Sequence, residues 1–473
     1  MYARALDLEL IGKPEEARRL FQLAAEQEPE LFWLRYEIAL CTRDLREWDA
    51  ATEQFEALYE EARAGNDPRA AIVTLNSHGV MELQRNRYDA AEERFLAADA
   101  TANEFGLPTD RATVKVNLAL IANRRGRIDE AGLHYEGALD AWEEAEVEPP
   151  PIFLNNYAGH LLRQGRLTEA RGFSERAVAG FRVQGHRRYE APSLNRLGRI
   201  LRRLGDLDGS LERHRESLAI YRDLDNVRGE LSATGGIVTT YRARGDLTRA
   251  RMHAEDALQR AESGDDQLIL ADTVMRIGQV EADAKNRAPA TQHFRRALGI
   301  FEELGDEPGR FGASLALIDV ALPDGDRDEA ESLARRLLAE AEENQQAARV
   351  AELSIAIARL HEARDEIDRA VSRYRQALDY ARDASNNRLL PLAAVHLGVL
   401  ELERGNVDVA QSLADEARPH ALVSRDQLRL DARIMLAAGD SGGALQTLRR
   451  LRELAGEVWT ADDQRLIERA EAG

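Results

Sequence analysis

The chain has 473 residues, of which 44% are hydrophobic and 5% aromatic, and its 64 basic and 84 acidic residues give a net charge of −20. The hydrophobic content excludes an intrinsically disordered chain, the single cysteine excludes a disulfide framework, and the lack of a long apolar run excludes a membrane-spanning helix. Because the acidic charge repels phosphate backbones, nucleic-acid binding is disfavoured, and we expect a soluble cytoplasmic protein.

An alanine in a constant local context recurs along the chain and predicts an internal repeat. In most copies a glycine lies five residues before it, as Gly126 does before Ala131. The spacing is 34 residues at both ends of the series and 39 or 40 residues between them. A fixed spacing of this kind indicates one solenoid rather than several separate domains. We name these positions anchors: Ala17, Ala51, Ala91, Ala131, Ala170, Ser210, Ala250, Ala290, Ala330, Ala370, Ala410 and Ala444.

Further columns keep step with the anchor and predict a helix–turn–helix hairpin. In the fourth repeat, Ala119 lies twelve residues before the anchor Ala131, while Tyr135 and Ala138 follow it by four and seven residues. Residues at these spacings share one helix face, where small residues admit a neighbouring helix and the aromatic ring fills the space beside them. The glycine before the anchor ends the first helix in a left-handed turn. Since one hairpin cannot bury its apolar face alone, we expect the hairpins to stack.

These columns resemble the tetratricopeptide repeat, whose usual length of 34 residues matches the first and last intervals. The longer interior units are similar to those of kinesin light chains, Pins-type adaptors and bacterial signalling arrays. The resemblance implies an all-α fold, a right-handed α-solenoid of about twelve stacked helix–turn–helix repeats. We expect a single solenoid over residues 1–459, followed by a C-terminal capping helix over residues 460–473.

Three segments modify this regular plan. The prolines of residues 148–151 cannot continue a helix, so they predict either a stiff joint between the fourth and fifth repeats or a slightly longer surface loop. Thr460 and Asp463 have the spacing of a capping box, which starts the predicted capping helix. The first helix begins at Met1 without its first few residues, so we expect either a frayed helix or an array that continues upstream.

The sequence contains no motif that carries chemistry. Phosphate-binding, dinucleotide-binding, hydrolase and zinc-protease motifs are absent, and none of the ten histidines lies three or four residues from another. The carboxylates are spread over solvated helix faces, usually with arginine at helical spacing. We therefore expect no catalytic residue, no metal site and no cofactor, and we predict that the protein is not an enzyme.

The first helices of the repeats carry a stripe at positions 15, 11 and 8 before the anchor, which holds several polar residues. Neighbouring flank positions add Asn117, Asn156, Arg163, Arg196, Arg203 and Arg276. In arrays that this chain resembles, first helices line a concave groove that binds extended peptides, and kinesin light chains and Pins-type adaptors use an asparagine ladder there. An amide can donate and accept at once, and arginine binds carboxylates in a bidentate manner. The predicted peptide-binding residues are Asn76, Asn117, Asn155, Asn156, Arg163, Asn195, Arg199, Arg202 and Arg242.

Other interpretations of this stripe stay open. Arginine is abundant, so some of these side chains could pair with glutamate of an adjacent repeat instead. Gly235 and Gly236 interrupt a first helix, and they favour tight packing over close approach of a ligand backbone.

Three functions fit these observations. The first is a non-enzymatic scaffold that binds an extended peptide segment of a protein partner in its concave groove, where the arginines favour an acidic segment. The second is a regulatory sensor array of a bacterial signalling or transcription-control system whose output domain lies elsewhere. The third is an RNA or phosphate-ligand binder that uses the groove arginines. The sequence identifies neither the partner nor the oligomeric state.

Overall fold

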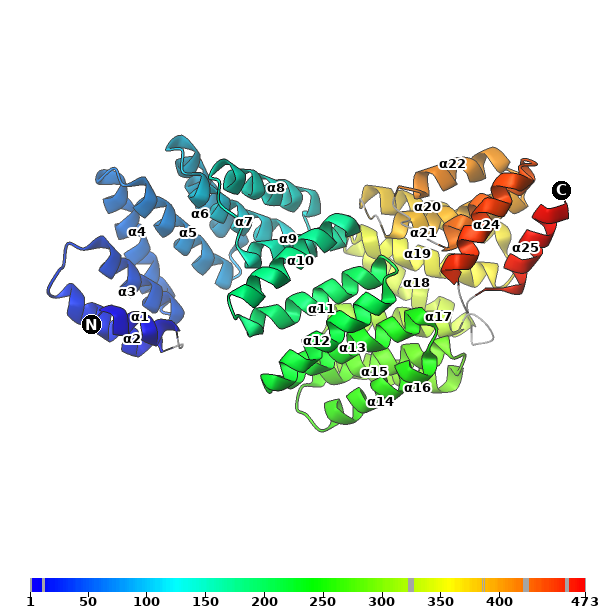
Figure 1. The fold of residues 1–473 in the computed structure, drawn as a ribbon, viewed down its shortest axis with the longest axis horizontal. Helices are drawn as coiled ribbons and strands as arrows, with labels where there is room; N and C mark the ends of the chain where they lie inside the picture. The colour runs from blue at the N-terminus through cyan, green and yellow to red at the C-terminus, as the bar shows by residue number, and fades with distance from the viewer. Residues whose placement is uncertain are drawn as a thin grey trace. The chain divides into compact units, whose positions relative to one another are not determined.

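The computed structural model describes residues 2–10, 13–321, 327–384, 386, 388–419, 425–455 and 459–472. Over these residues the chain forms 25 helices and no strand (Figure 1). The all-α prediction is therefore confirmed. Within the same residues, no helix combines the length and the apolar character needed to cross a membrane.

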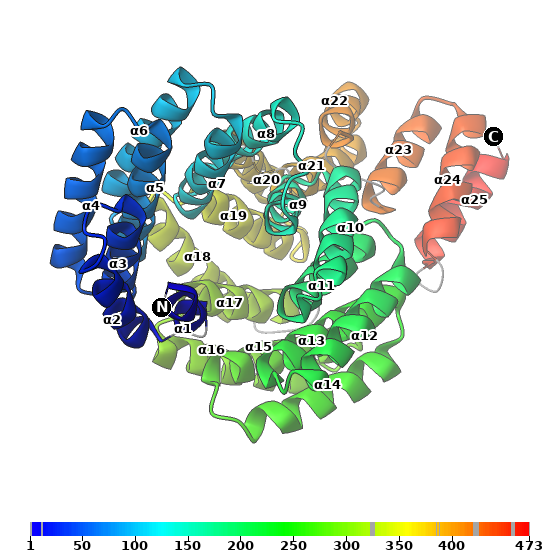
Figure 2. The same cartoon turned by 60° about the vertical axis from the view of Figure 1, so that its left-hand side comes forward.

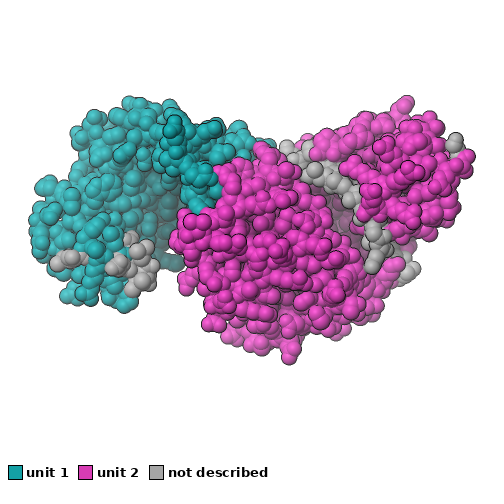
Figure 3. Space-filling model, viewed as in Figure 1, with its two compact units in different colours: residues 1–160 teal, residues 161–473 magenta. Residues whose placement is uncertain are grey.

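The chain divides into two compact units, residues 1–160 and residues 161–473 (Figure 3). Each helix packs against the next from α1 to α8 in the first unit and from α10 to α25 in the second. The first unit contains α1 (Tyr2–Leu10), α2 (Pro14–Ala25), α3 (Phe32–Asp44), α4 (Trp48–Ala64), α5 (Pro68–Gln84), α6 (Tyr88–Glu104), α7 (Pro108–Arg124) and α8 (Ile128–Glu144), and α9 (Pro151–Gln164) spans the division.

The second unit continues the same alternation of first and second helices. It contains α10 (Leu167–Val183), α11 (Arg187–Arg203), α12 (Leu207–Asp223), α13 (Val227–Arg244), α14 (Leu247–Glu262), α15 (Gln267–Asp283), α16 (Arg287–Leu304), α17 (Glu307–Ala321), α18 (Arg327–Glu343), α19 (Ala347–Glu362), α20 (Ile367–Asp383), α21 (Leu389–Glu403), α22 (Val407–Ala417), α23 (Arg425–Ala437), α24 (Ser441–Ala455) and α25 (Ala461–Ala472).

Every anchor lies on the second helix of its hairpin and is at most 6% exposed. The aromatic ring four residues later packs on the small residue of the first helix. A Cβ atom at Gly79 would lie 2.6 Å from the Phe95 ring, and one at Gly278 would lie 2.7 Å from the Phe294 ring. Small residues in this column therefore let the rings fill the space between paired helices, and the prediction of stacked helix–turn–helix repeats is confirmed.

The turn inside the hairpin is left-handed whether or not glycine occupies it. The position five residues before the anchor has a positive φ at Gly126, Gly165, Gly205, Gly245, Gly405 and Gly439, and also at Arg46, Asn86, Lys285 and Asp365. The corresponding Gly12 and Gly325 lie outside the described residues. The spacing thus determines the backbone conformation of the turn even where the residue type does not favour it.

The proline segment and the last helix can both be placed. Residues 147–150 form a non-helical connection, and Pro151 occupies the first turn of α9, where its missing N–H costs nothing. The single solenoid and the stiff joint stay predictions. At α25 the capping box is formed: the Thr460 hydroxyl accepts from the Asp463 N–H at 3.1 Å, and Asp463 accepts from the Thr460 N–H at 3.0 Å.

The first helices of the second unit line the inner side of its curve. Helix α13 packs against both α11 and α15, in addition to its own hairpin partner. Figure 2 shows the second helices α12 and α14 on the outer side of these three. Side chains on the free faces of α11, α13 and α15 therefore share one inner surface.

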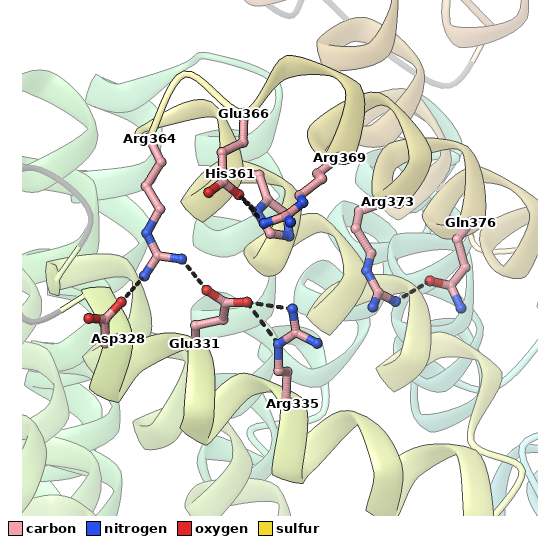
Figure 4. A network of polar contacts seen from close by, with 9 residues as sticks. All are labelled: Asp328, Glu331, Arg335, His361, Arg364, Glu366, Arg369, Arg373 and Gln376. Atoms are coloured by element: carbon pink, nitrogen blue, oxygen red, sulfur yellow. Dashed lines mark hydrogen bonds and ion pairs between the residues drawn. The ribbon is translucent and has the colours of Figure 1, made fainter.

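A periodic ion pair joins neighbouring repeats. An arginine at the end of a first helix binds an aspartate at the start of the preceding second helix, and the pairs are Arg125–Asp89, Arg244–Asp208, Arg364–Asp328 and Arg404–Asp368. Figure 4 shows the third pair, in which Arg364 also binds Glu331. Because the aspartates are exposed, each pair contributes at most about 1 kcal/mol. Much of the arginine in this acidic chain thus lies between repeats.

Candidate functional site

The predicted asparagines of the first unit lie on α5, α7 and α9. Nδ2 of Asn117 donates a hydrogen bond to Oδ1 of Asn76 at 2.7 Å, which joins two adjacent first helices. Asn155 is 8% exposed, and its Oδ1 finds no hydrogen-bond partner among the described residues. Asn156 beside it is half-buried. The structure therefore joins two of the four amides directly and leaves a buried acceptor at the third.

Asn195 of the second unit is also engaged within the solenoid. Nδ1 of His214 lies 2.6 Å from Oδ1 of Asn195, and Nδ2 of Asn195 donates to the hydroxyl of Ser232 at 3.1 Å. The amide thus connects its own hairpin with the first helix of the next repeat. Asn117 and Asn195 both have contacts between repeats that the sequence did not predict.

Three arginines of the inner surface lack the pairing seen elsewhere. Arg199 and Arg202 come from α11, and Arg276 comes from α15. Within the described part of the chain, none of the three makes a hydrogen bond or ion pair. Arg199 is exposed, whereas Arg202 and Arg276 are half-buried. We name these three residues, together with Arg242 of α13, the arginine cluster.

The charges of the arginine cluster act on one another. Burial lowers the pKa of Arg202, and the neighbouring positive charges of Arg199 and Arg242 lower it further. Burial likewise lowers the pKa of Arg276, against the attraction of Asp272. Arg242 is the paired member, because it donates to Asp283 and to Gln279, each at 2.6 Å. The cluster therefore carries positive charge that its own surroundings do not balance.

The adjacent glycines of α13 make room for two large polar side chains. A Cβ atom at Gly235 would lie 2.6 Å from Nε of Arg276, and one at Gly236 would lie 2.3 Å from the His214 ring. The ring of His214 is fully buried, and burial together with the nearby arginines lowers its pKa to about 3. Tight packing, and with it the position of Arg276, accounts for the glycine pair.

The nine predicted residues do not form one set. Four asparagines lie in the first unit, and Asn195 with the four arginines lies in the second. Arg163 is separate from the arginine cluster and lines a cleft that also contains Arg203 and Arg388. The sequence also places Arg276 beside the stripe, at the same position in the repeat as Arg196, but outside the nine predicted residues. Arg388 could not be found by periodicity, because it lies five repeats away from Arg203.

No group of histidine, cysteine, aspartate and glutamate that could hold a metal ion occurs among the described residues. The histidines with the lowest pKa values, His78 and His214, are buried between helices, and His78 also lines a pocket beside Glu82 and Arg85. The absence of catalytic residues and cofactors stays a prediction.

Comparison with known proteins gives matches in sequence and in structure. Residues 151–223 match the family model of the tetratricopeptide repeat. The regulatory protein AfsR of Streptomyces coelicolor is 29% identical over 140 residues, which amount to 29% of this chain and 14% of AfsR. The chain thus spans about a seventh of the length of this curated relative.

Solved structures resemble the chain over a larger part of its length. The apo form of the quorum sensor NprR from B. thuringiensis has a TM-score of 0.52 at 13% identity, over 80% of this chain and 97% of that one. Yeast Tom70 has a TM-score of 0.49 at 14% identity, over 100% of this chain and 94% of that one. The likeness to NprR concerns the fold. Residues 151–223 thus match the tetratricopeptide repeat, and stacked helical hairpins of similar length continue on both sides of this segment.

Proposed function

We propose that this protein is a non-enzymatic interaction protein whose arginine cluster binds an extended, acidic segment of a protein partner. The observation that carries the proposal is the convergence of Arg199, Arg202 and Arg276 on one inner surface, where none of them forms an ion pair or hydrogen bond with a described residue and only Asp272 attracts Arg276. Arginines of the turns, by contrast, pair with aspartate of the preceding repeat.

The electrostatics of the arginine cluster favours an anion. Like charges in a partly buried setting repel, so the free protein contains an unfavourable interaction that a bound carboxylate would relieve. Guanidinium groups bind carboxylates with two parallel hydrogen bonds, and α11, α13 and α15 present them along one surface. An extended segment would let successive acidic side chains reach successive first helices.

The acidic net charge of −20 adds selectivity. An acidic ligand is repelled by most of the surface and attracted where the arginines gather, which orients its approach and makes binding depend on ionic strength. Neutral peptides would lack this guidance. The ligand is therefore distinguished by its charge more than by its apolar side chains.

A second candidate, compatible with the first, is a regulatory sensor. The likeness to a regulatory protein of Streptomyces and to a quorum sensor favours a role in bacterial regulation. In this version the peptide is a signal, the output lies in another domain or protein, and the protein acts in the bacterial cytoplasm.

The test is fluorescence polarisation with a short, labelled, Asp- and Glu-rich peptide at low ionic strength, compared with its Asn- and Gln-substituted counterpart. We expect the acidic peptide to bind the native protein and the neutral peptide to bind far more weakly. Replacing Arg199→Gln and Arg202→Gln together should weaken binding by about tenfold or more, since each change removes a charge-assisted contact.

The matched control carries Arg171→Gln and Arg369→Gln, which remove the same charge from exposed arginines that pair within their own repeats. Equal loss in the control and in the cluster variant would contradict the proposal. A short RNA serves as a competitor, and displacement of the peptide by RNA at equal charge concentration would favour the phosphate-binding alternative.

A further inference from the structure

A cleft of about 940 Å³ lies within the second unit, and none of the arginine cluster lines it, although Arg203 of the cleft is the chain neighbour of Arg202. One wall consists of residues 163–169, at the turn between α9 and α10, and of Arg203 at the end of α11. The other wall is the first half of α21, which belongs to the eleventh repeat and can be followed beside α10 in Figure 2. The volume is at the upper end of the range for small-molecule sites.

Arginines from both walls line this cleft. Nη1 of Arg203 donates to the carbonyl oxygen of Leu162 at 2.7 Å, and Nη2 of Arg388 donates to Glu352 at 2.8 Å. Burial lowers the pKa of Arg203, and the charges of Arg199 and Arg388 lower it further. Arg203 has no carboxylate partner among the described residues.

The acidic residues of the cleft do not balance this charge, because other arginines already bind them. Glu169 accepts two hydrogen bonds from Arg166, each at 2.7 Å. Asp426 accepts from Arg429 at 2.8 Å. The unbalanced positive charge at Arg203 therefore stays available to an anion.

The wall formed by α21 is apolar next to the arginines. Pro391, Leu392 and Val395 line the cleft. Leu392 is 39% exposed, although the residues on either side of it in α21 are buried. A ligand that covered this side chain would remove apolar surface from water. The cleft thus combines an anion-binding end with an apolar wall.

We propose that this cleft binds a small amphiphilic anion, in which a carboxylate or phosphate group lies between Arg203 and Arg388 and an apolar body packs on Leu392 and Val395. Such a ligand contacts the sixth and the eleventh repeats at once, so its binding holds two distant parts of the second unit together. The proposal is independent of the acidic-peptide function, since neither Arg388 nor Leu392 belongs to the arginine cluster.

The experiment is isothermal titration of the full chain with hexyl phosphate and with hexanoate, and with inorganic phosphate and acetate as headgroup-only probes. We expect at least one amphiphilic probe to bind about tenfold more tightly than its headgroup alone, because burying several methylene groups adds apolar contact. The amphiphile that binds identifies the phosphate or the carboxylate as the preferred headgroup.

Variants assign the binding to the cleft. Arg203→Gln and Arg388→Gln should each weaken the binding of the amphiphile by about tenfold or more. Leu392→Ser should weaken the binding of the amphiphile but leave the binding of the headgroup probe unchanged. Arg369→Gln, an exposed arginine outside the cleft, should have no effect. Arg388→Gln provides a test that does not disturb the bond between Arg203 and Leu162.

Two results would overturn the proposal. One is that neither amphiphile binds the native protein, and the other is that Arg388→Gln and Leu392→Ser bind both amphiphiles as the native protein does. Titration of Arg388→Gln with the acidic peptide separates the two sites. If this variant binds the peptide as the native protein does but no longer binds the amphiphile, the two ligands use separate sites. Either proposal can therefore fail while the other stands.

Discussion

His214 shows how one residue connects the packing of the repeat with its inner surface. It occupies the column four residues after the anchor, where other repeats have Phe95 or Phe294, and its ring is fully buried between α11, α12 and α13. The sequence predicts the buried column but not its hydrogen bond to Asn195 within the same hairpin, because the phenylalanines of this column in other repeats form no such bond. Nε2 of the ring has no hydrogen-bond partner among the described residues.

The pKa of His214 predicts a pH dependence of stability. The folded protein holds this pKa at about 3, whereas an unfolded chain has its histidine near 6.5. Between these values the unfolded state binds more protons, so the free energy of unfolding falls as the pH falls. The free energy of unfolding should fall between about pH 7 and pH 5 in both proteins. We expect this fall, measured by urea unfolding, to be about 2 kcal/mol smaller in His214→Phe than in the native protein.

The control for this measurement is His186→Gln, at an exposed histidine that precedes α11. It should keep the pH dependence of the native protein. Equal pH dependence in His214→Phe and the native protein would show that the buried imidazole does not contribute.

At the scale of the helical hairpin, spacing predicts more than residue type does. The anchors and the small-residue column correctly assign first and second helices, since each hairpin repeats the same local packing. The turn could be predicted as left-handed from glycine at most positions. At Lys285, where φ is 61°, only the repeat spacing indicates a left-handed turn. The bonds from Asn117 to Asn76 and from Asn195 to Ser232 could not be predicted, because they join hairpins rather than form within one.

The left-handed turn at Lys285 gives a prediction for stability. A residue with a Cβ atom in this conformation costs roughly 1 kcal/mol relative to glycine. We expect Lys285→Gly to raise the free energy of unfolding by about this amount, measured by urea unfolding. The reverse change at the equivalent turn, Gly245→Lys, should lower it. A decrease for Lys285→Gly would mean that its side chain has a stabilising role that outweighs the backbone strain.

At the scale of the molecule, each repeat contacts mainly its neighbours, so stability comes from a series of similar interfaces. Periodicity along the chain predicts these interfaces well. It cannot predict the cleft between Arg203 and Arg388, because small rotations accumulate over five repeats and determine where the two walls lie. The two-unit division falls within α9, shortly after the prolines of residues 148–151, but the regular spacing of the anchors across this segment gave no sign of two units.

The end of the array depends on one buried ion pair. Asp463 of α25 is fully buried and accepts from Nε and Nη2 of Arg429 at 2.7 and 2.9 Å. Burial raises the pKa of Asp463, but hydrogen bonds from Arg429 and Thr460 outweigh it and lower the pKa to about 2. The stabilisation is therefore complete above the unfolded pKa of about 3.9 and is lost as the pH falls toward 2.

Removing the cation should release this last helix. Arg429→Gln leaves a buried carboxylate without its partner, which costs about 3 kcal/mol. Amide hydrogen exchange in α25 should then accelerate by about a hundredfold, while exchange in α11–α13 stays the same. Arg465→Gln, which affects an exposed pair with Asp462 on α25 itself, is the control. Unchanged exchange of α25 in Arg429→Gln would contradict this assignment.

The central claim is that the arginine cluster is the surface that meets the ligand. It is tested most directly by modifying arginines with phenylglyoxal, with and without the acidic peptide, and locating the modified residues by mass spectrometry. We predict that the peptide protects Arg199 and Arg202 and leaves Arg171 and Arg369 on exposed surfaces as reactive as before. Equal modification of Arg199 and Arg202 in the free and peptide-bound protein would contradict the claim.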